Sequence, residues 1–474
     1  MRYQLRKIIV YGFESKPAVD TLLRLQQEEI IKIVKWYYDE DLADARLLNC
    51  SVACKHTSLW RGDWQQVDAF LNEDASKCIL EQMDWLMQEY SRDTEFIREY
   101  FGEYKNLMWH LVNEFYRVFS KDTVDCVFFA DVPHGNSAAT LYVTARALGI
   151  KTLYIANIGS FADRFIYAHK VDEYGDFTNA LEYQEEAKNV YIREQFEKDL
   201  YYMTDDAIED ALKTSWHRKL KFLSSPSSWF RERQKIIVKS LDKYDGFIDF
   251  CERKAIYTIT KKLRCKEFAK NVRQYTEKNI DLQKKYVYFP LHLQPEMTTD
   301  TIGDIYRDQL LAIEKIRRFI PADWHIYVKE NPKQNALCRG KYFFKRLRSL
   351  PNVSYVTRSF DTYELMKQSQ FVATITGTAG YEAITGGKPA LIFGRAWYKS
   401  LPGVFAYKDD LRVDDILDCK INHAEVEAGV AALLKKTGKG IWRQYDLEHV
   451  PNLDLHKNDI DLYKSFYFLF TKCI

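Results

Sequence analysis

The chain has 474 residues, of which 46% are hydrophobic and 15% aromatic, and its formal net charge is +2. This composition is typical of a globular protein with more than one domain and excludes an intrinsically disordered chain. The near-neutral charge gives no global reason to expect nucleic acid as a partner. No run approaches the roughly 18 apolar residues of a membrane-spanning helix. The first residues form a charged strand and not an apolar signal region, so we expect a cytoplasmic protein.

The first 174 residues are expected to form a Rossmann-like α/β domain. Compact apolar runs alternate with segments of helical spacing, which is typical of a parallel sheet covered by helices. Residues 42–119 are expected to be mostly helical. The expected strands are Arg6–Phe13, Ile30–Asp39, Asp125–His134 and Lys151–Gly159, and the clearest helices are Pro17–Glu29 and Asn136–Gly149, the latter with Asn136 as its cap.

The rest of the chain predicts a helical segment and then a second α/β domain. Over residues 175–280 the alternation gives way to long charged helices, which predicts an insert or linker. Over residues 281–440 alternation returns and predicts a doubly wound domain. The tail, 441–474, ends in the helix Asp459–Cys473, whose apolar face we expect to pack back on the N-terminal domain. The second domain's expected strands are Lys285–Leu291, Trp324–Glu330, Val353–Thr357, Phe371–Gly377 and Pro389–Gly394.

Polar residues gather where the strands of the second domain end. Ligands of open α/β sheets bind outside the carboxyl ends of the strands, so these residues predict a binding site. The candidates are His292, Gln294, Glu296 and Thr298 after the first strand, Lys329 and Asn331 after the second, Thr376, Gly377, Thr378 and Ala379 after the fourth, and Arg395 after the last.

The stretch TGTAGYEAITGGKPALIFG, residues Thr376–Gly394, predicts nucleotide binding. Small residues at a helix start leave backbone N–H groups open to a phosphate, and the helix dipole adds partial positive charge. Glu382 is placed to accept hydrogen bonds from ribose hydroxyls. Lys329 and Arg395 can neutralise a phosphate. The alternatives are an ordinary tight turn at the helix start and solvated side chains at the two cations.

The first domain offers candidates for acid–base chemistry. Asp131 and His134 follow a buried strand and precede a helix, so either can deprotonate an acceptor hydroxyl, the alternative being helix capping or loop packing. Arg164 follows the next strand and can meet an acidic sugar or a phosphate. The chain has no Walker loop, no Gly-x-Gly-x-x-Gly after its first strand and no Gly-x-Ser-x-Gly elbow. The nine cysteines complete no metal-ligand set, so we expect free thiols and no metal site.

Four segments together, YFPLHLQPEMTT, DQLLAIEKI, WHIYVKENP and TGTAGYEAITGGKPALIFG, resemble the bacterial capsule polysaccharide biosynthesis family. This family includes the Kdo transferases of capsule assembly and related transferases of pseudaminic or sialic acid. The resemblance covers about residues 285–400. It implies a GT-B-like glycosyltransferase, with two Rossmann-like domains, a helical connecting region and a C-terminal crossover helix.

The resemblance also implies chemistry. The enzyme would be metal-independent and inverting, would need no cofactor, and would move a sugar from a nucleotide donor to a glycan or lipid-linked glycan acceptor. A CMP-linked nonulosonic acid is the favoured donor. Lys329 to Pro332 and Thr376 to Ala379 would hold the phosphate, and Glu382 the ribose. The family often has His where this chain has Asn331, so His292 or Lys329 is expected to compensate.

Two other functions stay open. One is an isomerase resembling the UDP-GlcNAc 2-epimerases, and the other is a non-catalytic capsule assembly or export factor.

The stretch Trp216–Lys239 interleaves Arg and Lys with Trp, Phe and Leu. It is either a solvated helical face or a peripheral contact with the inner face of the cytoplasmic membrane. The sequence does not determine the sugar, the linkage or the oligomeric state.

Overall fold

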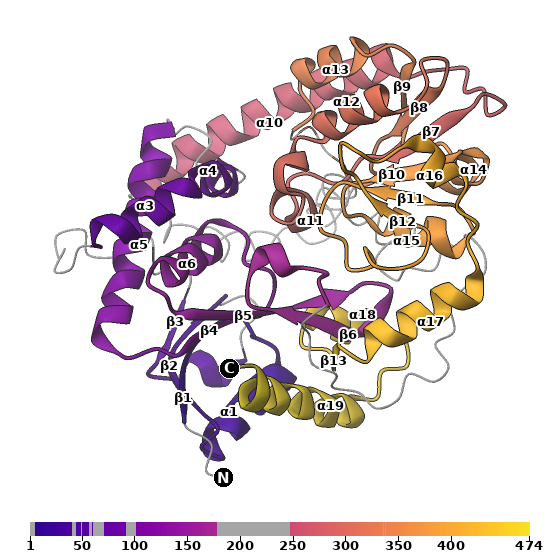
Figure 1. Ribbon diagram of the computed structural model, residues 1–474. Helices are drawn as coiled ribbons and strands as arrows, with labels where there is room; N and C mark the ends of the chain where they lie inside the picture. The colour runs from indigo at the N-terminus through magenta and orange to yellow at the C-terminus, as the bar shows by residue number, and fades with distance from the viewer. Residues whose placement is uncertain are drawn as a thin grey trace, which may run out of the picture. The chain divides into compact units, whose positions relative to one another are not determined.

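A computed structural model describes residues 5–39, 44–48, 50–55, 59, 71–91, 101–177, 247–334, 336 and 338–474. The chain divides into two compact units, Met1–Val190 with Val430–Ile474, and Tyr191–Gly429. Each unit is built around its own sheet (Figure 1). The basic and aromatic stretch Trp216–Lys239 lies outside the described residues.

The sheet of the first unit has seven strands in the order β13-β6-β5-β4-β1-β2-β3. The pairs from β3 to β5 are parallel, whereas β6 is antiparallel to β5 and β13 antiparallel to β6. The strands are β1 (Arg6–Tyr11), β2 (Ile31–Tyr38), β3 (Ala53–Lys55), β4 (Cys126–Phe129), β5 (Lys151–Ile158), β6 (Phe161–Ala168) and β13 (Gly438–Lys439). The helices are α1 (Lys16–Gln27), α2 (Ala45–Leu48), α3 (Glu73–Glu81), α4 (Met83–Ser91), α5 (Phe101–Lys121), α6 (Asn136–Ala147), α18 (Gln444–His449) and α19 (Leu455–Phe468), with a short 3-10 helix at Val171–Glu173 and a π-helix at Leu469–Cys473.

The C-terminal helix α19 lies beside α1, although more than 400 residues separate them in the chain (Figure 1). Its apolar face enters the core of the first unit, where Phe466 is fully buried. The Phe466 ring meets Phe13 at 5.5 Å and Phe128 at 5.2 Å between centroids, both edge-on. Burying one such ring is worth about 1.5–3 kcal/mol, so the helix is an integral part of this unit.

The sheet of the second unit has six strands, all parallel, in the order β12-β11-β10-β7-β8-β9. The strands are β7 (Tyr286–Pro290), β8 (His325–Lys329), β9 (Val353–Val356), β10 (Phe371–Thr374), β11 (Ala390–Ile392) and β12 (Val404–Ala406). The helices are α10 (Phe247–Tyr275), α11 (Met297–Asp300), α12 (Gln309–Phe319), α13 (Lys341–Arg348), α14 (Thr362–Gln368), α15 (Thr378–Thr385) and α16 (Val413–Leu417), with a 3-10 turn at Asp304–Arg307, and α17 (His423–Leu434) runs from this unit into the first.

Both sheets have a doubly wound order that reverses in the middle. Numbered within each unit, the strands of the second unit run 3-2-1-4-5-6, and the parallel strands of the first run 3-2-1-4-5. This is the Rossmann order, and it confirms the predicted α/β class. The order reverses between β1 and β4 in the first unit and between β7 and β10 in the second. Such switch points are where open α/β sheets bind ligands.

Some local predictions were wrong. The described part of residues 42–119 is mostly helical, as expected, but the short edge strand β3 within it was missed. The strand β12 follows β11, where the series was expected to end. Asn136 is the first residue of α6 and not its cap, because Gly135 holds the cap position. Among the helices that the structure describes, none combines the length and apolarity needed to cross a bilayer.

Candidate functional site

The switch point of the second unit is bridged by His292. This residue follows β7, and its Nε2 lies 2.8 Å from the Thr374 hydroxyl at the end of β10. The Ile375 N–H donates to the same nitrogen at 3.3 Å. Gln309 contacts the His292 backbone in both directions, accepting from its N–H and donating to its C=O. His292 therefore ties the two central strand ends together.

The His292 imidazole is neutral at physiological pH. Burial, together with the nearby Arg339 charge, lowers the pKa of His292 from 6.5 to about 4. Because the Ile375 N–H can only donate, Nε2 must accept and Nδ1 carries the proton. This arrangement favours a positioning role for His292 over proton donation to a departing phosphate.

Helix α15 starts directly above this imidazole. Its cap is Gly377, where an added Cβ would stand 3.0 Å from the His292 Nε2 and 3.0 Å from the Thr374 hydroxyl. At Gly380 a Cβ would clash with the hydroxyl of Tyr398, which itself donates to the Gly377 carbonyl. The protein's own packing therefore leaves little room for a side chain at Gly377, and a side chain at Gly380 would displace Tyr398. The same turn leaves the first-turn N–H groups of α15, including those of Thr378 and Ala379, without intrahelical partners.

Two hydroxyls link this turn to α11. The Thr376 hydroxyl donates to the Thr298 carbonyl at 2.6 Å, and the Thr298 hydroxyl donates to the Glu296 carboxylate at 2.7 Å. The Glu296 N–H in turn donates to the Asp300 carboxylate. The structure thus brings Glu296, Thr298 and Thr376 into one chain of contacts beside Gly377, as expected of residues at one strand-end edge.

Glu382 lies one turn into α15, within hydrogen-bonding reach of Thr378. Burial raises the pKa of Glu382 from 4.5 to about 7. An acid in this range changes charge near neutrality and accepts hydrogen bonds best when it is ionised. The predicted ribose contact would therefore depend on pH.

Gln294 is held inside the protein and is fully occupied. Its side-chain NH₂ donates to the Arg307 carbonyl and to Asp300, and its side-chain oxygen accepts from Gln309 at 2.7 Å and from Arg339 at 3.0 Å. Its backbone exchanges two further hydrogen bonds with the Gln334 side chain. No hydrogen-bonding capacity of the Gln294 amide is left for a ligand, so the geometry favours a supporting role.

Arg339, which the sequence analysis did not single out, is the centre of this polar network. Its side chain is fully buried and pairs with the buried carboxylate of Glu330 at 3.2 Å. It also donates to the His292 carbonyl at 3.0 Å, while Glu330 accepts from the Tyr355 hydroxyl. A buried ion pair is stable only when all of its charged and hydrogen-bonding partners are present, because a buried charge without a partner is strongly destabilising. It locks the loops after β7 and β8 to one another.

The two expected phosphate-binding cations lie in different environments. Lys329 ends β8 and is only 3% exposed, so it is not a solvated lysine. Arg395 is partly exposed and already pairs with Asp304 at 2.7 Å. Asn331 shapes the turn after β8, because its side-chain oxygen accepts from the Lys333 N–H. Lys329 is connected to the loop that carries His292, because the Leu291 N–H donates a backbone hydrogen bond to the Lys329 carbonyl.

The switch point of the first unit carries Asp131 and His134. Asp131 accepts from the Val132 N–H, and the His134 Nδ1 lies 2.6 Å from the Val132 carbonyl. A carbonyl only accepts, so Nδ1 carries a proton and Nε2 of the neutral ring is an acceptor. This tautomer is the one that a general base acting through Nε2 requires.

Two residues at this edge were missed from the sequence. Glu14 follows β1, its carboxylate accepts from the Asp39 N–H at 3.1 Å, and burial raises the pKa of Glu14 to about 6. The preceding Phe13 has φ of 65°, a left-handed conformation that bulky residues rarely adopt. Trp442 reaches the same edge from the C-terminal segment, donating from Nε1 to the Ala130 carbonyl at 2.8 Å. Glu14 could have been identified from the sequence, because it is a carboxylate that directly follows the first strand of a Rossmann-like unit.

Arg164 does not lie at a strand end, so its predicted position was wrong. It lies within β6, where it pairs with Lys439 of β13. The segment FADRFIYA continues the sheet in the antiparallel direction after a tight turn, a connection that the expected strand-to-helix pattern did not include. Its Nη1 is buried and has no hydrogen-bond partner among the residues that the structure describes.

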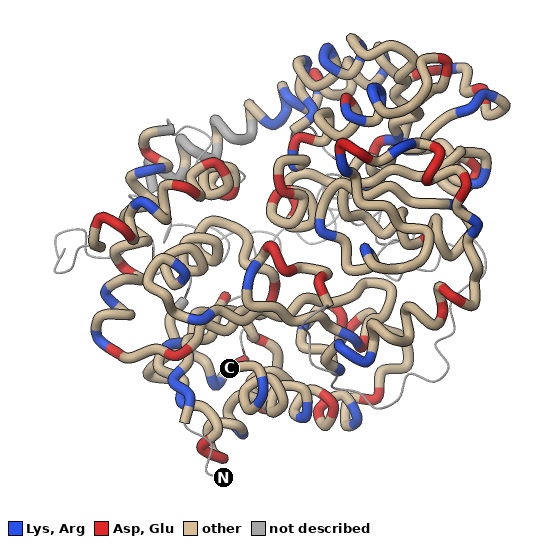
Figure 2. The backbone as a smooth tube through the Cα atoms, viewed as in Figure 1, with Lys and Arg blue, Asp and Glu red and all other residues tan. Residues whose placement is uncertain are grey.

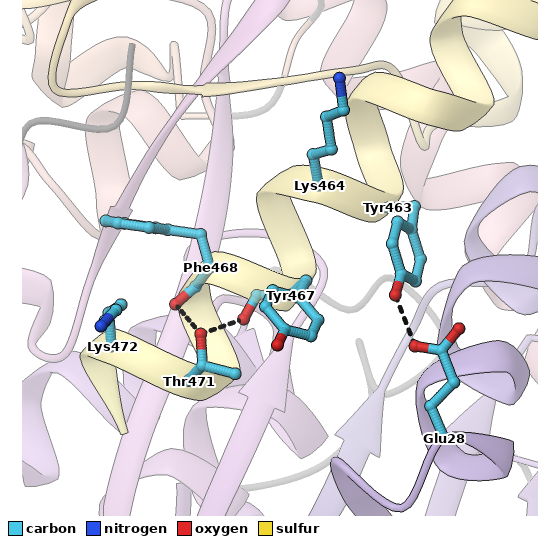
Figure 3. A pocket seen from close by; sticks show the side chains of 7 residues that line it. All are labelled: Glu28, Tyr463, Lys464, Tyr467, Phe468, Thr471 and Lys472. Atoms are coloured by element: carbon cyan, nitrogen blue, oxygen red, sulfur yellow. Dashed lines mark hydrogen bonds between the residues drawn. The ribbon is translucent and has the colours of Figure 1, made fainter. Parts of the chain in front are cut away.

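A cavity of about 630 Å³ opens elsewhere in the first unit, along α19 and the π-helix that follows it. Figure 3 shows Tyr463 directed at Glu28 of the loop after α1, with the Tyr463 hydroxyl donating to the Glu28 carboxylate. Lys464 and Lys472 also line it. None of the predicted site residues lines this cavity. Within the described ranges no three His, Cys, Asp or Glu side chains are grouped to hold a metal ion.

Three solved structures are distantly similar to the chain. The β-Kdo 2,7 transferase KpsC of Thermosulfurimonas dismutans is 13% identical, over 67% of this chain and 79% of that one, with a TM-score of 0.30. The β-Kdo 2,4 transferase KpsC of the same organism is 13% identical over 68% and 86%, with a TM-score of 0.28. The UDP-GlcNAc 2-epimerase of Methanocaldococcus jannaschii is 12% identical over 91% and 93%, with a TM-score of 0.22.

The comparison with protein families is more specific. No curated protein sequence matches the chain. Residues 230–411 match the family described as capsule polysaccharide biosynthesis protein. The matched range contains strands β7 to β12 and the whole of helix α15. The match over residues 230–411 therefore confirms the resemblance of this part of the chain to the capsule polysaccharide biosynthesis family.

Proposed function

We propose that the protein is a glycosyltransferase of capsule or surface polysaccharide biosynthesis and that its second unit binds the nucleotide-sugar donor. The observation that carries the proposal is the switch point between β7 and β10. There a helix start built on Gly377 stands over a buried histidine, inside the range that matches the family. The first-turn N–H groups of α15 form the anion-binding part, and the dipole of the helix supports it.

In this proposal the donor's phosphate is bound by the α15 start and by Lys329. The Glu382 carboxylate accepts from the ribose hydroxyls, and the Thr376 hydroxyl and the Arg339 network keep the turn in place. His292 acts as a neutral spacer beneath Gly377. Charge on the departing nucleotide is stabilised by fixed dipoles and by a buried cation, which cost little reorganisation during the reaction.

The acceptor hydroxyl would be deprotonated by a residue of the first unit. His134 has a free acceptor nitrogen in its neutral form, and Asp131 lies in the same loop. We favour an inverting displacement with one of these residues as the base and a CMP-linked nonulosonic acid as the donor. The Asp131→Ala and His134→Ala variants should each be tested for transfer and for nucleotide binding separately, since loss of a base removes the first and spares the second.

The decisive experiment is a thermal-shift screen of the full chain against CMP, UDP, GDP and their sugars, followed by donor consumption with and without a glycan acceptor. Stabilisation by CMP and acceptor-dependent consumption support the proposal. Stabilisation by UDP alone with acceptor-independent turnover of UDP-GlcNAc would replace it with an epimerase. A chain that binds no nucleotide and consumes no donor would instead be an assembly or export factor.

A further inference from the structure

The outward face of helix α10 carries a basic stripe with no acidic residue in it. Between Ile259 and Arg273 the sequence holds six Lys or Arg residues and a single acid, Glu267. At 3.6 residues per turn, one side of the helix presents six residues. They are Ile259, Lys262, Leu263, Lys266, Lys270 and Arg273. Figure 2 shows Lys and Arg, in blue, recurring along α10.

The opposite side of α10 is the one that packs. Phe268, Val272 and Tyr275 contact the core of the second unit. The Tyr275 ring stacks on Phe344 of α13 at 5.4 Å, and Phe268 meets the same ring at 6.3 Å. Over Phe268–Tyr275 the helix is therefore held by one face, and Lys270 and Arg273 are on the face turned away from the core. Residues 261–267, Glu267 included, are all exposed.

Every residue of the stripe is exposed, including its two aliphatic members. Ile259 is 59% exposed and Leu263 is 61% exposed, one turn apart. Lys262, Lys266 and Lys270 form no ion pair with any residue that the structure describes. Two neighbouring aliphatic side chains therefore lie among cations that form no ion pair within the described ranges. A surface that offers both negative charge and an apolar layer matches this pattern.

We propose that the basic stripe of α10 binds the surface of an anionic phospholipid bilayer. The four cations would lie at the level of the phosphates, while Ile259 and Leu263 would enter the boundary between headgroups and acyl chains. A soluble polyanion, such as a nucleic acid or an acidic glycan, would use the cations and leave the two aliphatic side chains in water. The presence of both kinds of side chain in one stripe therefore selects the bilayer.

The test is flotation of the full chain with vesicles of phosphatidylcholine alone and of phosphatidylcholine mixed with phosphatidylglycerol. The wild type should float with the mixed vesicles, should not float with the neutral ones, and should be released by salt. Replacing Lys262, Lys266 and Lys270 by Gln should weaken partitioning roughly 100-fold, since each cation near an anionic surface contributes about one decade or less. Replacing Ile259 and Leu263 by Ser should weaken it about 10-fold.

Matched variants control for net charge and for exposed apolar area. Lys345, Lys408 and Lys420 are exposed lysines elsewhere in the second unit, and Ile305 and Leu455 are exposed to a similar extent as the two aliphatic residues of the stripe. Changed to Gln and Ser respectively, they should leave flotation unchanged, with all variants showing cooperative melting. The proposal is overturned if the wild type does not float, if it floats equally with neutral vesicles, or if the control lysine variant loses as much binding as the stripe variant. Loss with the lysine variant but not with the Ile259/Leu263 variant would also overturn it and would assign the stripe to a soluble polyanion.

Discussion

Replacing His292 by Gln tests whether this imidazole is a buried neutral acceptor. A Gln side-chain oxygen can take the place of Nε2 and keep an acceptor for Ile375 N–H and the Thr374 hydroxyl. It cannot take up a proton in the accessible pH range. The variant therefore removes the titration of the side chain while keeping most of its hydrogen bonding.

The size of the effect follows from the two pKa values. The pKa of His292 is about 4 in the folded chain, against 6.5 for an unperturbed histidine. Between pH 6.5 and pH 4, His292 is protonated in the unfolded chain but stays neutral in the folded chain. The folded state therefore loses stability relative to the unfolded state as the pH falls from about 6.5 to about 4. Between pH 7 and pH 5 the wild type should lose about 2 kcal/mol of unfolding free energy that His292→Gln does not lose.

The assay is urea unfolding of both proteins at pH 7 and at pH 5, with protection of β7 and β10 peptides in pulsed hydrogen exchange as the signal. These peptides report on the second unit alone. His292→Asn, whose shorter side chain leaves the Ile375 N–H without an acceptor, should be less stable than His292→Gln by about 1–3 kcal/mol at both pH values. An equal stability gap between wild type and His292→Gln at the two pH values would refute the buried neutral imidazole.

Three further predictions concern the same strand-end region. The affinity of the wild type for CMP relative to that of Glu382→Gln should rise roughly tenfold from pH 6 to pH 8 in calorimetric titrations, because the carboxylate with a pKa of about 7 ionises over this range; a constant ratio would exclude the ribose contact. Gly380→Ala should destabilise the second unit by about 1–3 kcal/mol in urea, because the added methyl group displaces the buried Tyr398, whereas the control Gly340→Ala, where a Cβ meets nothing within 4 Å, should be close to neutral. Arg339→Met should cost about 3–5 kcal/mol in the same assay, because it leaves a buried carboxylate unpaired, and a variant as stable as the wild type would show that the network is dispensable.

The strands of the second unit were predictable because their signals are local. Segments such as KYVYFPL and FVATITG are short, apolar and bounded by turn residues, and they became β7 and β10 with ends shifted by a few residues. The strands β3, β6 and β12 were missed for a physical reason. They lie at or near the sheet edges, where one side needs no apolar partner, and the segment FADRFIYA carries charged residues within the strand.

The polar network behind the candidate site was not predictable in this way. Gln294 and Arg339 are 45 residues apart, and each looks like a surface residue in its own segment. Because both side chains are buried together in the folded chain, the Arg339 guanidinium donates a hydrogen bond to the Gln294 side-chain oxygen. Glu14 was missed for a related reason, since an acidic residue after a strand usually faces water, and its raised pKa depends on how the β1 and β2 ends surround it.

The sequence alone determined the alternation of strands and helices, the polar character of the strand ends and the family resemblance of residues 285–400, because each depends on residue type and spacing along the chain. The tertiary structure decided which of those polar groups remain available to a ligand. It placed His292 in a neutral state in which Nε2 accepts hydrogen bonds, occupied the hydrogen-bonding groups of Gln294, buried Lys329 and paired Arg395 with Asp304. Burial and hydrogen-bond partners arise from contacts between segments that are distant in the chain. The charge state of each site residue, and the hydrogen-bonding groups that it still has available, therefore depend on the fold and not on the sequence motif.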